Sequence, residues 1–331
     1  MAASVTVDPA VPSYYLVDPR GLSTGAANSG SHVQIERALG STVLRVYGSI
    51  GVDAQPDEEE VAIQDPAEYA AMALKAILEA RGIAVRGVAR AKHRLPVTAR
   101  GFLDQSNEPL LFLEMRSQQA RSCLGPETFG CDGLPQTAPA LMAIHRSSPL
   151  GQDAVITNKE SQNLHAELLL RQLGQVLGEE GTEHGIDNET AAQGARIVRQ
   201  FLVNAGIDKD DFVFFDGSGL SGHDLVTPRA TVKLLQYAAG TVQPWFADWK
   251  KSLPVGGVDG SLQERFAKAP LAGHVFAKTG TLGEARALSG YLECASGKTV
   301  IFSIMVGNHA PRDHADRDAM DKIVAAIAAS N

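Results

Sequence analysis

The order of apolar and polar residues divides the chain into an early part of short strands and a later part of long helices. Residues 41–47 have the pattern of a strand, with Leu44 and Val46 on one face and Val43 and Arg45 on the other. We therefore expect a strand here with one face turned toward a core.

A helix is predicted after an acidic, proline-containing stretch. Asp65 can cap it, Pro66 suits the first helical position, and Glu68 lies three residues after the cap. Apolar residues then recur at helical spacing and form one stripe, namely Ala70, Leu74, Ile77 and Leu78. Gly82 favours the end of this helix, and residues 83–88 have the pattern of a strand that leaves it.

Longer helical patterns begin near residue 147, and strands follow them. The predicted helices cover residues 162–177 and 189–205, begin again with Thr227 as a cap, and cover residues 316–329 at the end. The predicted strands cover residues 274–279, 287–293 and 299–306. Because these strands are consecutive, without βαβ alternation, we expect an α+β fold with an antiparallel sheet.

Composition excludes some classes of protein. Of 331 residues, 44% are hydrophobic and the net charge is -8, so a globular core is expected and a nucleic-acid partner is not. No apolar run is long enough to cross a bilayer, so no transmembrane segment is predicted. Residues 1–19 lack the basic start and apolar stretch of a signal peptide.

The three cysteines leave two interpretations open. Cys123 and Cys131 flank a short loop and could form a local disulfide, or they could be unrelated thiols, since the third residue, Cys294, makes the total odd. A zinc site needs more ligands at close spacing than these cysteines provide, and we expect no metal or other cofactor.

One segment near the end combines a strand pattern with chemically useful side chains. In Lys278-Thr279-Gly280-Thr281, the lysine would supply positive charge, the two threonines hydroxyl groups, and the glycine room for a substrate backbone. The backbone N–H of Thr281 could contribute to an oxyanion hole. A lone Lys-Thr-Gly also occurs by chance as a basic residue at a strand end.

A second segment, Ser161-Gln162-Asn163, stands near the start of an amphipathic helix. Ser161 could exchange protons with a lysine, and Asn163 could donate to a substrate carbonyl. The simpler interpretation is that Ser161 caps the helix.

Two further arrangements are possible. Ser218, with His223 and Asp224 nearby, could be the nucleophile of a different hydrolase, but Asp216 occupies the first glycine position of the Gly-x-Ser-x-Gly elbow. A metal could also bind among His309, Asp313, His314, Asp316 and Asp318, although a solvated loop before the last helix is the simpler account.

Taken together, the motifs resemble those of one family. Five occur in family order: residues 161–164, 216–221, 253–255, 259–262 and 278–281. The chain thus resembles the D-alanyl-D-alanine carboxypeptidase/endopeptidases of the class C, low-molecular-mass penicillin-binding proteins. The resemblance implies a β-lactamase/transpeptidase-like domain, an antiparallel sheet with flanking helices, whose carboxy-terminal part is residues 146–331. It makes residues 1–145 the remainder of an α+β domain inserted in that domain.

The resemblance also implies a function. It implies a serine-type peptidase with an acyl-enzyme mechanism, in which Ser161, Asn163 and Lys278 are catalytic and Thr279, Gly280 and Thr281 bind the substrate. The implied partners are peptidoglycan stem peptides ending in D-Ala-D-Ala and, for the complete protein, β-lactams. Family members act in the periplasm or otherwise outside the cytoplasm.

One family signature is missing from the chain. The nucleophile of the family lies in Ser-x-x-Lys, and none of the eleven lysines here has a serine three residues before it. By the resemblance, the nucleophile helix, the first sheet strands and an export signal are expected to precede Met1, so the chain is expected to be amino-terminally incomplete and inactive alone. The alternative is a non-catalytic remnant that binds stem peptides.

Overall fold

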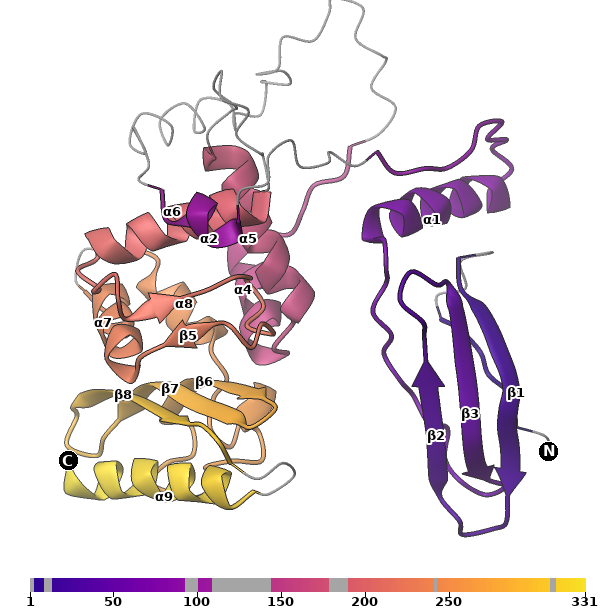
Figure 1. Cartoon of the computed structure of the whole chain (residues 1–331). Coiled ribbons are helices and arrows are strands. Elements are labelled where there is room, and N and C mark those ends of the chain that lie inside the picture. Colours follow the sequence, from indigo (N-terminus) through magenta and orange to yellow (C-terminus); the bar gives the residue numbers. More distant parts are fainter. Residues whose placement is uncertain are drawn as a thin grey trace, which may run out of the picture. The chain divides into compact units, whose positions relative to one another are not determined.

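The computed structural model (Figure 1) describes residues 3–8, 14–92, 101–108, 144–178, 190–240, 243–309 and 314–331. The chain forms two compact units, residues 1–95 and 96–331. The boundary expected after residue 145 falls inside the second unit. None of the helices within these ranges is long and apolar enough to cross a membrane.

The first unit contains a three-stranded sheet. Its strands are β1 (Leu16–Gly25), β2 (Ser31–Glu36) and β3 (Val43–Gly51), in the order β1-β3-β2. The central strand β3 is parallel to β1 and antiparallel to β2. Leu44 and Val46 are buried and Arg45 is exposed, which confirms the alternation predicted for β3.

The predicted helix is confirmed as α1 (Pro66–Ala80), with the Asp65 carboxylate accepting from the N–H of Glu68 at 3.0 Å. Its apolar stripe contains no buried residue in the described part of the chain. The strand predicted at residues 83–88 is wrong. After the positive φ of Gly82, the segment folds back along the helix, and Lys75 Nζ donates to the carbonyl of Gly87 at 2.9 Å. An extended stretch becomes a strand only where a neighbouring strand pairs with it.

Helices make up most of what the structure describes in the first half of the second unit. They are α2 (Phe102–Ser106), α4 (Leu150–Lys159), α5 (Asn163–Leu177), α6 (Thr190–Asn204), α7 (Pro228–Ala238) and α8 (Phe246–Ser252), with the short strands β4 (Phe212–Val213) and β5 (Leu225–Val226) before α7. Thr227 caps α7 as predicted, accepting from the N–H of Ala230 at 3.1 Å. Helices α5 and α6 approach closely at two glycines. A Cβ on Gly174 of α5 would lie 1.9 Å from the carbonyl oxygen of Thr190, and one on Gly194 of α6 would lie 2.0 Å from that of Leu170.

The second half of this unit is an antiparallel sheet in the order β6-β7-β8, built from β6 (Val275–Leu282), β7 (Ala285–Glu293) and β8 (Thr299–Val306). Helix α9 (Ala315–Ser330) covers one face (Figure 1), where Met320 and Val324 join a core with Val275, Ala277 and Leu288. The other face packs against the helices through Tyr291, whose hydroxyl donates to the carbonyl of Leu235.

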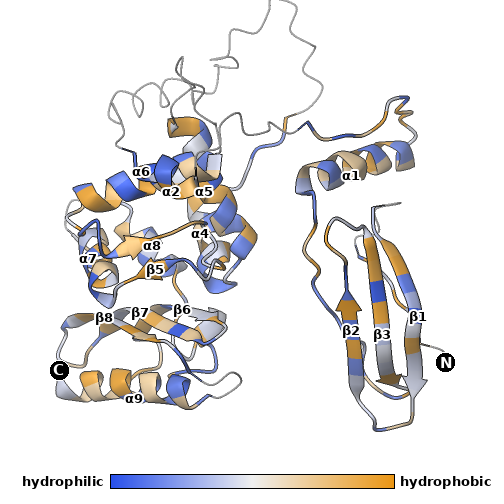
Figure 2. Cartoon of the chain, in the orientation of Figure 1, coloured by the Kyte–Doolittle hydropathy of each residue, from blue (hydrophilic) through white to orange (hydrophobic). Residues whose placement is uncertain are grey.

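These elements confirm the predicted α+β class. The three predicted strands and the last helix are all present. Apolar residues predominate along β8 (Figure 2), and successive residues of β7 and β8 are buried or half-buried, as strands covered on both faces require. The sheet therefore has two packed faces, and β6 forms one of its edges.

Candidate active site

Strand β6 has an outer edge that is only partly covered. Its first half is paired by the segment before η1 (Gly260–Leu262, a 3₁₀ turn), because Ala277 N–H donates to the carbonyl of Pro254 at 3.0 Å. Backbone groups of an antiparallel strand alternate in direction, so the N–H groups of Thr279 and Thr281 face the same edge as that of Ala277. Within the described ranges no backbone group pairs with this second half.

Ser161 lies in the short connection between α4 and α5. The end of α4 is closed by the N–H of Gln162, which donates to the carbonyl of Thr157 at 3.1 Å. Ser161 itself has a φ of 55°, in the left-handed region that residues with a side chain rarely adopt. The turn thus holds the Ser161 hydroxyl at a fixed place next to the end of α4.

The structure brings two predicted site residues into contact. Lys278 Nζ donates to Ser161 Oγ at 2.7 Å and to the carbonyl oxygen of Thr279 at 2.7 Å. Burial lowers the pKa of the Lys278 ammonium, because removal from water disfavours its charged form. The pair is therefore a hydrogen-bonded amine and hydroxyl in which the amine releases its proton more readily than an exposed lysine.

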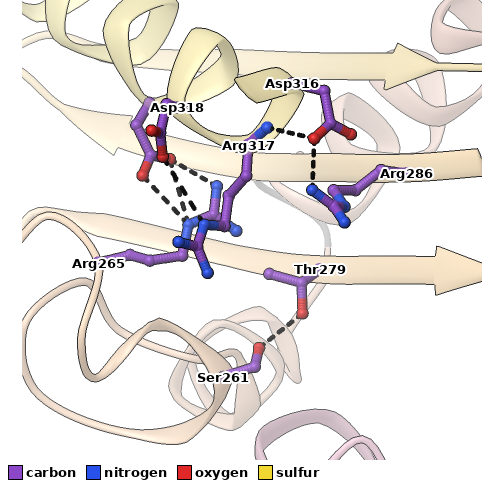
Figure 3. A network of polar contacts seen from close by, with 8 residues as sticks. Ser261, Arg265, Thr279, Arg286, Asp316, Arg317 and Asp318 are labelled. Atoms are coloured by element: carbon purple, nitrogen blue, oxygen red, sulfur yellow. Dashed lines mark hydrogen bonds and ion pairs between the residues drawn. The ribbon is translucent and has the colours of Figure 1, made fainter. Parts of the chain in front are cut away.

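The other predicted residues surround this pair. Thr279 Oγ1 lies 2.7 Å from the hydroxyl of Ser261 (Figure 3), while Gly280 and Thr281 are exposed at the open edge of β6. Asn163 is exposed at the first position of α5. In the described part of the chain, neither Asn163 nor Thr281 has a side-chain hydrogen bond to the other site residues.

The interpretation of Ser161 as a helix cap is wrong. The capping residue of α5 is Gln162, whose side-chain oxygen accepts from the N–H of Leu164 at 3.2 Å. The longer glutamine side chain reaches the helix start, so the hydroxyl of Ser161 remains directed to Lys278.

The arrangement with Ser218 as a nucleophile is also not formed. Ser218 Oγ donates to the carboxylate of Asp216 at 3.1 Å, and the carboxylate of Asp224 accepts from the N–H of Phe215 at 2.6 Å. The ring of His223 contacts the ring of Phe215. A Ser-His-Asp relay needs the histidine between the other two side chains.

Neither the metal site nor the disulfide receives support. No cluster of three or more histidine, cysteine, aspartate or glutamate residues that could hold a metal occurs in the described residues, which omit Asp313. Asp316 instead pairs with Arg286 of β7 (Figure 3). Cys294 is buried and free, whereas Cys123 and Cys131 lie outside the described residues.

An ion pair beside the site was not predicted from the sequence. Lys159, the last residue of α4, binds the carboxylate of Asp259 directly before η1. The sequence holds one signal for it, because Lys159 stands two residues before Ser161 and Asp259 two residues before Ser261. That spacing acquires meaning only once the two segments are known to meet.

Comparison with known proteins decides the family. The D-Ala-D-Ala carboxypeptidase 3 (S13) family matches residues 2–113 and 128–328. The chain belongs to this family. A D-alanyl-D-alanine carboxypeptidase of Actinomadura sp. (strain R39) is 30% identical over 319 residues, which are 94% of this chain and 50% of that protein.

A second curated relative matches over a shorter part of the chain. The D-alanyl-D-alanine carboxypeptidase DacB of Haemophilus influenzae is 30% identical over 204 residues, 60% of this chain and 40% of that protein. Among solved structures, penicillin binding protein 4 (dacB) of Haemophilus influenzae, complexed with a novel β-lactam, matches with a TM-score of 0.65 at 21% identity. That match covers 94% of this chain and 61% of the other, and it shows a shared fold. The 331-residue chain thus spans about half the length of its Actinomadura relative.

Proposed function

We propose that the turn at Ser161 and the open edge of β6 form part of the active site of a serine-type D-Ala-D-Ala carboxypeptidase/endopeptidase. The observation that carries the proposal is the 2.7 Å hydrogen bond from Lys278 Nζ to Ser161 Oγ. Membership in the S13 family supports the substrate class, which is peptidoglycan stem peptides ending in D-Ala-D-Ala.

The proposed proton path uses the Lys278–Ser161 pair. Because burial lowers the pKa of Lys278, its ammonium gives up a proton at lower cost than an exposed lysine, and Ser161 can pass that proton on through its hydroxyl. In acyl transfer the amine that leaves with the terminal D-Ala needs this proton. The two residues are therefore proposed as catalytic.

The open edge of β6 is proposed to hold the substrate. A peptide laid along Thr279–Thr281 can pair with the outward-facing backbone groups of this edge, and Gly280 leaves space for its backbone. The hydroxyls of Thr279 and Thr281 would receive the terminal carboxylate, and the N–H of Thr281 would face the developing oxyanion. Asn163 is proposed as a donor to a substrate carbonyl.

The nucleophile of the proposed acyl-enzyme is not among these residues. Since Ser-x-x-Lys does not occur in the sequence, we expect the 331 residues alone to bind a D-Ala-D-Ala peptide without being acylated. Peptidoglycan lies outside the cytoplasmic membrane, so the proposed site of action is periplasmic or otherwise extracytoplasmic. β-Lactams are proposed as covalent ligands only where a Ser-x-x-Lys nucleophile accompanies this site.

Two measurements on the 331-residue chain test the proposal. A fluorescent penicillin should leave no covalent label, and labelling at any serine would contradict the expected lack of a nucleophile. In the second measurement, an N-acetylated tripeptide ending in D-Ala-D-Ala is titrated against an otherwise identical L-Ala-L-Ala peptide.

Binding of the D-Ala-D-Ala peptide should be selective, and Lys278→Met should weaken it by about tenfold or more, because the positive charge of the Lys278 amine next to Thr279 would attract the terminal carboxylate. Lys250→Met, which removes a lysine from α8, should leave the affinity unchanged. Equal binding of the two peptides, or unchanged affinity in Lys278→Met, would contradict the proposed site.

A further inference from the structure

A second pair of charged residues lies beside the Lys278–Ser161 contact and is not part of the proposed chemistry. Lys159 ends α4 and binds the carboxylate of Asp259. Its side chain is 16% exposed and that of Asp259 is 38% exposed, so water reaches the pair only in part. Partial burial makes such a pair stronger than a fully exposed one.

Asp259 connects this pair to the edge of β6. One carboxylate oxygen binds Lys159, and the other accepts from the N–H of Val255 at 3.0 Å. Val255 pairs in turn with Phe276 of β6. Asp259 stands at the capping position of η1 but makes no capping hydrogen bond with its side chain, so both oxygens serve to join these other segments.

Close backbone packing accompanies the ion pair. A Cβ on Gly260 would lie 3.1 Å from the carbonyl oxygen of Lys159, and the φ of Gly260 is positive. One residue earlier in α4, Asn158 Nδ2 donates at 2.7 Å to the hydroxyl of Ser252, which is fully buried. Two successive side chains therefore hold the end of α4: Asn158 binds Ser252 of α8, and Lys159 binds Asp259 before η1.

These contacts close a ring around the site. From β6 the ring passes through Val255 to Asp259, across the ion pair to Lys159, and two residues on to Ser161. It returns to β6 through the hydrogen bond from Lys278. Ser161 adopts its left-handed conformation within this ring, where the surrounding contacts offset the backbone strain.

We infer that the Lys159–Asp259 ion pair is the positioning element that holds Ser161 against Lys278. The inference rests on the proposed function for its catalytic meaning, but the geometry it describes exists without substrate. Loss of the pair should release the turn at Ser161 and let water reach the Lys278 amine.

The exposure of the Lys278 amine to water can be followed through its titration. Trace acetylation with acetic anhydride is carried out across a pH series, and mass spectrometry measures how much of each lysine is acetylated, which reports the titration of that amine. In Lys159→Met and in Asp259→Asn, the titration of Lys278 should move upward toward that of an exposed lysine. The asparagine variant keeps an oxygen for the N–H of Val255 and removes only the charge. The exchanged pair, Lys159→Asp with Asp259→Lys, should restore the titration of the unaltered chain.

The control is Lys250→Met. Lys250 pairs with Glu293, and the side chains are 21% and 38% exposed, close to the values for Lys159 and Asp259. Lys250 also lies 4.2 Å from the ring centre of Phe276 in β6, so a disturbance carried by the strand alone would appear in this variant. We expect the titration of Lys278 to be unchanged in it.

Two results would overturn the inference. One is an unchanged titration of Lys278 in folded Lys159→Met, or in Asp259→Asn if the first variant does not fold. Another is an equal upward shift in Lys250→Met. Because acetylation involves no peptide or penicillin, its outcome is independent of the binding test, and failure of the positioning role is distinguishable from failure of the proposed function.

Discussion

Lys278 Nζ and Ser161 Oγ are 2.7 Å apart, although 117 residues separate the two in sequence. The lysine reaches across from β6 and the serine lies in the turn between α4 and α5. Through this contact, the protonation of Lys278 and the backbone conformation of the turn at Ser161 depend on each other. Four expectations follow from these contacts and from the packing of the second unit.

Removal of the Lys278 amine should change how stability depends on pH. Burial lowers the pKa of Lys278 below its ordinary value of 10.5. Between the lowered pKa and 10.5, the unfolded chain binds more protons than the folded chain, so the free energy of unfolding rises with pH in that window. Below the lowered pKa, Lys278 is protonated in both the folded and the unfolded chain, so the free-energy cost of burying its charge is fully present.

The checking measurement is the difference in unfolding free energy between the unaltered chain and Lys278→Met, from urea titrations at several pH values. The difference should shift in favour of the unaltered chain as pH rises toward 10.5. Lys322→Met removes an exposed lysine of α9 and serves as the control. A difference that does not change with pH would contradict the effect of burial on Lys278.

The left-handed conformation of Ser161 predicts an order of stability between two substitutions. Ser161→Gly and Ser161→Ala both remove the hydroxyl, but only glycine adopts a φ of 55° without steric cost. Ser161→Gly should be more stable than Ser161→Ala by about 1–2 kcal/mol. Urea unfolding measures the difference, and equal stability of the two variants would show that the turn is not held in this conformation.

Two glycines of the sheet should respond differently to an added methyl group. A Cβ on Gly290 of β7 would lie 2.1 Å from the carbonyl oxygen of Phe276, whereas one on Gly280 meets only the side chain of Ala287 at 3.7 Å. Gly290→Ala should lower the free energy of unfolding by roughly 1–3 kcal/mol or more, because it separates β6 from β7.

Gly280→Ala should be as stable as the unaltered chain and should weaken binding of a D-Ala-D-Ala peptide, because the methyl group projects from the same face of β6 as Lys278 and narrows the space for the peptide. Thermal unfolding and peptide titration check the two variants together. A stable Gly290→Ala, or a Gly280→Ala that binds with full affinity, would contradict the packing at these positions.

The pair of Arg229 and Asp211 should determine part of the acid sensitivity of the second unit. Arg229 Nε donates to Asp211 Oδ2 at 2.7 Å, and this hydrogen bond holds the pKa of Asp211 below its usual 3.8. The stabilisation is present above pH 3.8 and is lost as pH falls through the lowered pKa.

Arg229→Ala should therefore unfold at a higher pH than the unaltered chain in an acid titration followed by circular dichroism. Arg317→Ala removes an arginine whose pair with Asp318 is solvent-exposed, and its acid midpoint should stay unchanged. An unchanged midpoint in Arg229→Ala would show that Asp211 is not held by this arginine.

Local patterns predicted most of the elements because their causes are local. The cap and proline at Asp65 and Pro66 fix the start of α1, and the valine, phenylalanine and threonines of residues 275–282 favour the extended conformation of β6. The same reasoning failed at residues 83–88, where an apolar run pairs with no strand among the residues that the structure describes. It also misassigned the cap of α5, since Gln162 and Ser161 are both able to cap and only the turn geometry selects between them.

By itself, the sequence determined the residue types of the candidate site, their order along the chain, the family, and the absence of a Ser-x-x-Lys segment from these residues. Only the tertiary structure decided that Lys278 contacts Ser161 and that Lys159 binds Asp259. The first contact joins the turn after α4 to the edge of β6, and the second joins the end of α4 to the residue before η1, across 117 and 100 positions of the sequence. Their geometry depends on how α4 packs against α8 and η1, and no local pattern encodes that packing.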